Sequence, residues 1–151
     1  MAFQRSFWGL FIAAFLVLGG LNDARAEEKT HKVVLQVDQN DAAIMNLALN
    51  NMQNIISYYK GKGEKVTVEL VTFGPGLEML RLDNSPVAER IGAIAKDNPE
   101  VQFSACQNTM QAVAKKEGGE KPPLLDSATE VPSGVVRIIE LQQQGYAYIR
   151  P

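Results

Sequence analysis

The segment from His31 to Asp38 contains a near-continuous apolar run, formed by Val33, Val34, Leu35 and Val37. A strand with one solvated face alternates apolar and polar residues, whereas a strand buried on both faces reads as an almost unbroken apolar run. Strands of the second kind occur in parallel sheets that are covered by helices on both faces. The run therefore predicts a buried parallel strand and restricts the chain to an α/β fold.

Further strand-like segments alternate with helix-period segments along the chain. The later strands are expected at Val66–Phe73, Val101–Ala105, Ala128–Val131 and Tyr146–Ile149. Helices are expected after the N-cap candidates Asp41, Ser85 and Ser133 and from Gln107, with a short helix or turn at Leu77–Leu82. The order β-α-β-α-α-β-α-β-α-β predicts a three-layer α/β/α sandwich with a mostly parallel sheet of about five strands.

Apolar residues at helical spacing indicate which face of a helix enters the core. On the first helix these are Ile44, Leu47, Ala48, Met52, Ile55 and Tyr59, and on the last they are Val135, Ile138, Ile139 and Leu141. The pair Leu124-Leu125 is conspicuous because it follows the polar loop 117–123. We expect this pair either to cover a pocket at the cysteine or to contribute to a subunit contact.

The first 26 residues have the pattern of a secretory signal peptide. Arg5 precedes the apolar segment Phe7–Leu21, and Ala24-Arg25-Ala26 provides a small-residue cleavage site. The apolar segment is shorter than the roughly 20 residues of a membrane-spanning helix, although an uncleaved anchor is the alternative. We therefore expect cleavage after Ala26, a periplasmic or secreted mature protein that is free of the membrane, and one domain over 27–151.

The charge of the chain argues against a nucleic-acid partner. The sequence contains 15 Lys and Arg and 17 Asp and Glu, a formal charge of −2. Removal of Arg5, Arg25 and Asp23 with the signal peptide leaves 13 basic and 16 acidic residues, a charge of −3. The basic residues are dispersed, and Lys115-Lys116 is only a pair near a helix end.

The single cysteine, Cys106, lies where a strand is expected to end and a helix to begin. Helix N–H groups at this place would favour a thiolate, and ligands bind at this edge of parallel sheets. Alternatively, the cysteine is a small buried hydrophobe. With one cysteine, an exported chain cannot form an internal disulfide, so the thiol is free, capped or paired with another chain.

Several segments together resemble one known family. The cysteine segment FSACQNTM, the strand KVVLQVD, the turn VTVELVTFGPG and the ending VPSGVVRIIELQQQGYAYIRP resemble the DsrE/DsrF-like sulfur-relay family, which has the YchN-like fold. The resemblance extends over about Lys32–Pro151 and is greatest to small exported members of unassigned function. It implies an α/β/α sandwich and homo-oligomers, usually trimers or hexamers.

The resemblance also implies a function. Cys106 matches the sulfur-carrying cysteine of the family, which holds a persulfide and passes it from a donor protein to an acceptor protein. Such a carrier, whether or not it is counted as a sulfurtransferase-type enzyme, requires an exposed thiol of low pKa but no cofactor and no metal. Export separates this chain from the cytoplasmic roles of better-known members, so only the thiol chemistry is carried over.

A second hypothesis is a non-catalytic oligomeric module that binds a small ligand or a protein. Its pocket would lie at the carboxyl edge of the sheet, as would the pocket of a carrier. The residues expected to border that pocket are Asp38, Asn40, Gly74, Gly76, Asn108 and Thr109. Reactivity of Cys106 at neutral pH would separate the two hypotheses.

Other chemistry has less support in the sequence. The mature chain contains one histidine, His31, which precedes the first strand and is expected at the end of the sheet opposite Cys106. A Cys-His dyad within one subunit and a metal site are therefore not expected. Asp38 and Asp41 could act as an acid/base pair, but Asp41 also fits an N-cap, and a carboxylate at Asp38 would raise the pKa of a nearby thiol.

Overall fold

The computed structural model describes residues 30–151. Its elements are β1 (Thr30–Val37), α1 (Ala42–Gly61), β2 (Lys65–Thr72), the 3₁₀ helix η1 (Gly74–Leu80), α2 (Ala88–Asp97), β3 (Val101–Cys106), α3 (Gln107–Glu117), β4 (Ala128–Val131), α4 (Gly134–Gln143) and β5 (Ala147–Ile149). The signal peptide and its cleavage site fall outside the described residues and stay predictions. Between residues 30 and 151, no helix is long and apolar enough to cross a membrane.

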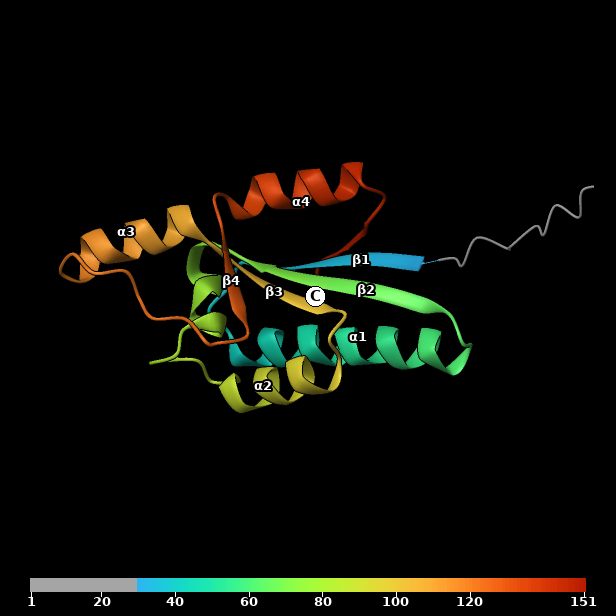
Figure 1. Ribbon diagram of the computed structural model, residues 1–151. Helices are drawn as coiled ribbons and strands as arrows, with labels where there is room; N and C mark the ends of the chain where they lie inside the picture. Colours follow the sequence, from blue (N-terminus) through green and yellow to red (C-terminus); the bar gives the residue numbers. More distant parts are fainter. Residues whose placement is uncertain (1–29) are drawn as a thin grey trace, which may run out of the picture.

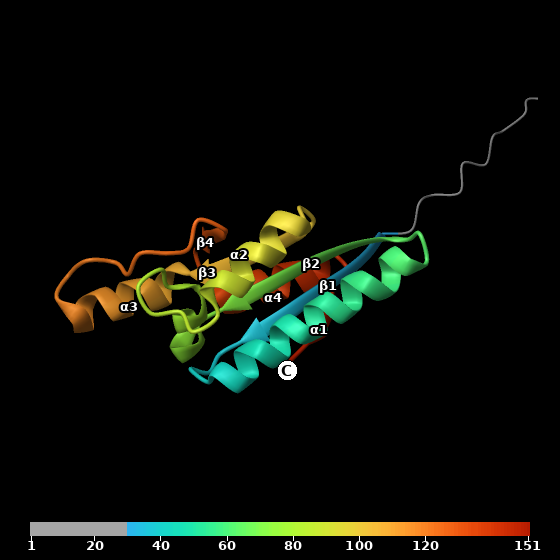
Figure 2. The ribbon, with the colours of Figure 1, turned by 90° about the horizontal axis from the view of Figure 1, so that it is seen from below.

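The five strands form one parallel sheet in the order β4-β3-β2-β1-β5. Helices α1 and α2 cover one face and α4 covers the other, while α3 extends beyond the carboxyl ends of the strands (Figure 1). Seen from below, α1 runs alongside β1 (Figure 2). The predicted α/β sandwich with a five-stranded sheet is therefore confirmed.

The larger part of the core lies between the sheet and the layer of α1 and α2. Helix α1 buries Met45, Ala48, Leu49, Met52 and Ile56. The predicted stripe was partly wrong, because Leu47 is 44% exposed. The buried residues also follow a helical spacing, since Met45, Leu49, Met52 and Ile56 are four, three and four positions apart. Sequence periodicity alone therefore did not distinguish the buried face of the helix from its exposed face.

Helix α2 begins later than predicted. The sequence suggested Ser85 as N-cap, but the first helical residue is Ala88 and the cap position is Val87. The Ser85 hydroxyl instead donates to the Met79 carbonyl at 2.6 Å and accepts from the Val87 N–H at 3.3 Å. It therefore fixes the turn between η1 and α2. The predicted caps Asp41 and Ser133 are confirmed, because their side chains accept helix N–H groups.

The pair Leu124-Leu125 packs on the core beneath η1 in this fold. Leu125 is buried, and its N–H donates to the Leu80 carbonyl at 3.0 Å. Leu124 forms an antiparallel bridge with Arg81 and packs on the same core. The two leucines therefore close the core beneath η1, with Leu124 partly exposed, and the predicted subunit contact stays a prediction.

Candidate functional site

Cys106 is the last residue of β3 and occupies the N-cap position of α3, as predicted. The register of the sheet pairs it with Val131 of β4 on one side. On the other side, Ala105 is level with Thr72, so Phe73 follows β2 at the level of Cys106. The thiol is therefore at the carboxyl edge of the sheet. Only 4% of the residue is exposed, so access to it is restricted.

The Cys106 sulfur is surrounded by hydrogen-bond donors. Burial raises the pKa of the thiol, but the nearby Thr109 hydroxyl and the backbone N–H groups of Gly134, Thr109 and Asn108 outweigh this effect, and the net pKa is lowered. The Asn108 and Thr109 donors belong to the first turn of α3, whereas Gly134 is the first residue of α4. The amino ends of two helices therefore converge on one sulfur, a geometry that favours its anionic form.

A hydrogen bond from the Gly74 backbone orients the Thr109 hydroxyl. The Gly74 N–H donates to Thr109 Oγ1 at 2.9 Å. Because one lone pair of the oxygen is occupied in this way, its proton is free to point at Cys106, and the incoming hydrogen bond polarises the hydroxyl. Gly74 has φ +54°, a left-handed conformation that glycine adopts without strain. Gly74 thus acts on the thiol through Thr109.

Gly134 allows α4 to approach the cysteine closely. A Cβ atom at this position would lie 3.0 Å from Phe73 Cδ1 and 3.3 Å from Cys106 Cβ. An alanine here would crowd these side chains, so that Phe73, Cys106 or α4 would have to shift by a few tenths of an ångström. The sequence prediction did not include Gly134 among the site residues. The available signal was the pair Ser133-Gly134, a cap followed by glycine, directly after a strand.

The structure brings together only part of the predicted pocket. Gly74, Asn108 and Thr109 lie at Cys106, as described above. Asp38 follows β1, two strands from β3, which corresponds to roughly 10 Å between backbones. It pairs with Arg150 at 3.1 Å, on the far side toward β5, so its charge is directed away from the thiol. Asn40 is exposed in the loop before α1.

Gly76 has a packing role instead of a place at the thiol. A Cβ atom on Gly76 would lie 2.2 Å from the Val37 carbonyl oxygen and 2.8 Å from the Asp38 nitrogen. The glycine therefore lets η1 lie directly on the end of β1. This contact places Gly74, two residues earlier, at the sheet edge where it reaches Thr109.

The other ionisable candidates are committed to structural contacts. Asp41 caps α1 through hydrogen bonds from the N–H groups of Ala43 and Ile44. His31 lies at the start of β1, at the end of the sheet opposite Cys106, where it stacks on Tyr59 and contacts Glu64. Within residues 30–151, no three His, Cys, Asp or Glu side chains form a group that could hold a metal ion.

A recess of about 230 Å³ lies one strand away from Cys106. Its lining comprises Val131, Pro132, Ser133, Val136, Arg137 and Glu140. Larger recesses of about 670 Å³ and 480 Å³ lie at the start of α2 and at the amino ends of the strands, away from the thiol. The small recess therefore lies along the first turn of α4 and beside Val131, the β4 residue that pairs with Cys106.

Comparison with known proteins identified one informative relative. No family model and no curated protein matches the chain. Among solved structures, the chain is similar to the protein of unknown function MTH1491 from Methanobacterium thermoautotrophicum, with 31% sequence identity and a TM-score of 0.67. The match covers 80% of this chain and 99% of that chain. The similarity therefore extends over the whole of the relative.

Proposed function

This chain belongs to the same family as the MTH1491 protein, and from the geometry at Cys106 we propose that it is a sulfur carrier. Cys106 would accept a sulfane sulfur as a persulfide and pass it to a partner protein. The relative has no known function, so the proposal rests on the site. The observation that carries it is the convergence of the α3 and α4 amino ends on one sulfur.

A cysteine that only fills space needs no such surroundings. Buried free cysteines usually behave as small hydrophobes with a weak S–H donor. Here the Thr109 hydroxyl and the Gly134 N–H are donors near the sulfur, and they favour the thiolate over the thiol. Each donor lowers the free energy of an anion at this position. The site is therefore suited to a nucleophilic sulfur.

The proposed transfer is a thiol–disulfide type of exchange. The Cys106 thiolate attacks the outer sulfur of a donor persulfide, R–S–SH. A bond forms between Cys106 Sγ and that sulfur, the S–S bond of the donor breaks, and the donor leaves as the thiolate R–S⁻. The proton stays on the transferred sulfur, giving Cys106–S–SH, and the sulfane sulfur keeps its oxidation state. Delivery is the same exchange with Cys106 as the leaving thiolate.

The same donors serve both halves of this exchange. A thiol of low pKa is present as the attacking thiolate at neutral pH, and it also leaves more readily. The hydrogen bonds from Thr109 and Gly134 would therefore support loading and delivery alike. No general base is needed, which agrees with the distance of His31 from the site.

Sulfur uptake tests the proposal. The folded protein is exposed to polysulfide, and its intact mass is measured before and after treatment with a reducing thiol. We expect the wild type to gain about 32 Da, one sulfur atom, and to lose it on reduction. Cys106→Ser should gain nothing. Uptake by the serine variant, or no uptake by a folded wild type, would contradict a carrier role for Cys106.

The competing proposal is a non-catalytic binding module. The observation that favours it is the 4% exposure of Cys106, because a carrier must present its sulfur to a partner. In this reading the recess at Val131 and Val136 binds a ligand, and the thiol lies behind it, next to Val131, and takes no part. Alkylation distinguishes the two: a binding module would leave Cys106 unreactive in the folded protein and reactive only after denaturation.

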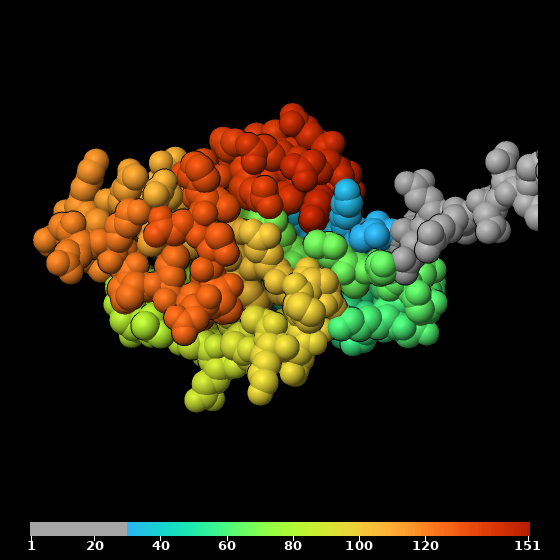
Figure 3. Space-filling view, viewed as in Figure 1, coloured from blue at the N-terminus to red at the C-terminus, as the bar shows by residue number. Residues whose placement is uncertain are grey.

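We further propose that the chain assembles as a trimer or hexamer, as the family resemblance implies. Physical support comes from α4, which forms a ridge along the top of the molecule (Figure 3). Its residues Val135, Val136 and Ile139 are 52%, 50% and 49% exposed, although two of them were predicted to be core. Neighbouring exposed apolar side chains indicate an interaction surface.

Light scattering at micromolar concentration measures the assembly. We expect three or six times the mass of one chain, and a lower mass for Ile139→Asp, which places a charge on the ridge. Leu47→Asp is the matched control, because Leu47 is an exposed apolar residue of α1 on the opposite layer. A wild type that remains monomeric would refute the proposed assembly.

A further inference from the structure

Glu69 is a carboxylate inside the apolar strand β2. Its residue is 2% exposed, and its neighbours along the strand, Val68 and Leu70, are fully buried. Glutamate is almost never fully buried unless it is paired, because an isolated charge loses its hydration. The sequence analysis did not single out Glu69. Its position at the centre of an apolar strand was nevertheless a signal that a partner exists.

The partner is Arg137 of α4. Arg137 Nε and Nη2 donate to the two carboxylate oxygens of Glu69 at 2.8 and 2.7 Å, a bidentate ion pair. The hydroxyl of Ser104 in β3 donates to the same carboxylate at 2.6 Å, and Gln102 donates to Ser104 at 3.3 Å. The buried charge is thus both neutralised and hydrogen-bonded, the condition for keeping it inside a protein.

This ion pair and the cysteine site share α4, and Ser104 links the ion pair to β3, the strand of Cys106. Arg137 follows Gly134 by three residues, about one helical turn. Ser104 precedes Cys106 by two residues, so both side chains are on the face of β3 that α4 covers. At the start of α4, Gly134 lies beside Cys106 of β3. One turn later, Arg137 binds Glu69 of β2, and the Ser104 hydroxyl links that carboxylate to β3.

The apolar contacts of α4 are made with the neighbouring strands β1 and β2. Ile138 and Leu141 pack with Val34 of β1 and Val71 of β2. These contacts hold the middle of the helix over the centre of the sheet. No residue of β3 belongs to this apolar cluster, whereas the Gly134 N–H must be held beside Cys106 of β3. A directional contact near β3 is better suited to that task, because bidentate pairs fix geometry as well as contributing energy.

We propose that the Glu69–Arg137 ion pair is a positioning device, which holds the first turn of α4 so that the Gly134 N–H stays on the Cys106 sulfur. The inference rests on the proposed function, since it assigns to these residues the support of the reactive thiol. Glu69 and Arg137 act through Gly134 and are positioning residues. Their effect should therefore be visible in the ionisation of Cys106 as well as in stability.

The test is the double variant Glu69→Gln/Arg137→Met. It removes one negative and one positive charge together, so that the net charge near the thiol is unchanged. The pH dependence of iodoacetamide alkylation then reports the pKa of Cys106. We expect this pKa to rise and the thiolate fraction at neutral pH to fall about three- to tenfold. Lys60→Met/Glu100→Gln, which removes an ion pair at the opposite end of the sheet, should leave the pKa unchanged.

A second variant covers the case in which the first does not fold. Arg137→Lys keeps the charge but loses the bidentate fork, and should raise the pKa of Cys106 by a smaller amount. If stability falls in either folded variant while the pKa of Cys106 stays at the wild-type value, the pair is only structural and the inference is wrong.

The result of this alkylation test can be distinguished from the result of the sulfur-uptake test of the proposed function. A wild type that takes up sulfur while the variants leave its thiol pKa unchanged would refute the positioning role alone. A wild type that takes up no sulfur, but whose thiol pKa responds to the variants, would refute the carrier alone.

Discussion

Gly76→Ala should destabilise the fold by about 3 kcal/mol or more. The new methyl group would lie 2.2 Å from the Val37 carbonyl oxygen and 2.6 Å from its carbon. Both atoms belong to the backbone at the end of a central strand, so neither can turn aside as a flexible side chain would. Either η1 or β1 must move. Since domains of this size are stable by about 5–15 kcal/mol, urea unfolding should show a much lower midpoint.

Gly92→Ala is the matched control. Gly92 is exposed in α2, and a Cβ atom there meets no other atom within 4 Å. Alanine is favoured over glycine inside a helix by about 1 kcal/mol, so this variant should be slightly more stable than the wild type. A Gly76→Ala protein as stable as the wild type would show that η1 does not lie on the end of β1 as described.

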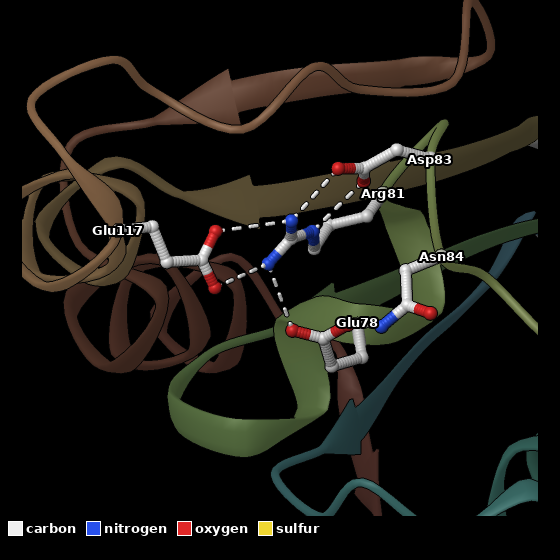
Figure 4. A network of polar contacts seen from close by, with 5 residues as sticks. All are labelled: Glu78, Arg81, Asp83, Asn84 and Glu117. Carbon is white, nitrogen blue, oxygen red and sulfur yellow. Dashed lines mark hydrogen bonds and ion pairs between the residues drawn. The ribbon is translucent and has the colours of Figure 1, made fainter.

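Arg81→Met should cost about 2–3 kcal/mol. Arg81 is 7% exposed and donates to Glu78, Asp83 and Glu117 at 2.8 to 3.2 Å (Figure 4). Methionine would fill the space but leave three carboxylates close together without their cation. This loss of folding stability is smaller than that expected for a fully buried ion pair, because Asp83 and Glu117 are about half exposed and water screens their charges.

The control for this variant is Lys121→Met. Lys121 and Glu130 form an ion pair at 2.9 Å in which both side chains are 41% exposed, and its removal should change stability by less than about 1 kcal/mol. Equal effects of Lys121→Met and Arg81→Met in urea unfolding would contradict the role given to the Arg81 cluster. That cluster joins the last residue of α3 to η1, the two elements that carry Thr109 and Gly74.

The contribution of the Arg81 cluster to folding stability should also depend on pH. The hydrogen bonds from Arg81 lower the pKa of Asp83 below its ordinary value. A carboxyl whose pKa is lower in the folded than in the unfolded state stabilises the fold above its unfolded pKa, about 3.9, and this contribution is lost as the pH falls through the folded pKa. Arg81→Met should therefore lose less stability than the wild type when the pH is lowered below about 4.

The sequence predicted the parts of the site that depend on local order. The alternation of Val101, Phe103 and Ala105 followed by a helix-period run placed Cys106 at a strand–helix junction, and the structure has it there. Thr109 and Asn108 follow from this placement, because donors in the first turn of a helix reach its N-cap position. The order of the elements and the caps at Asp41 and Ser133 were also readable from neighbours in the sequence.

The remaining parts depend on which strands are neighbours, and local patterns do not contain that information. Gly134 reaches Cys106 because β4 pairs with β3, and Asp38 does not because β2 lies between β1 and β3. The loops that carry Asp38 and Gly134, like Cys106 itself, follow the carboxyl ends of strands. The sequence therefore placed them at one edge of the sheet but did not give their distances from Cys106. Val135 and Ile139 likewise face outward because the sheet-facing side of α4 carries Arg137, Ile138 and Leu141.

The central claim is that Cys106 is a thiolate held by donors from two helices. The most direct measurement is the rate of alkylation of Cys106 in the folded wild type as a function of pH, with Thr109→Val measured beside it. We predict a midpoint below the ordinary value of a free thiol, and a higher midpoint when the Thr109 hydroxyl is removed. A folded protein whose cysteine resists alkylation, or titrates at or above about 8.5 in both proteins, would contradict the account.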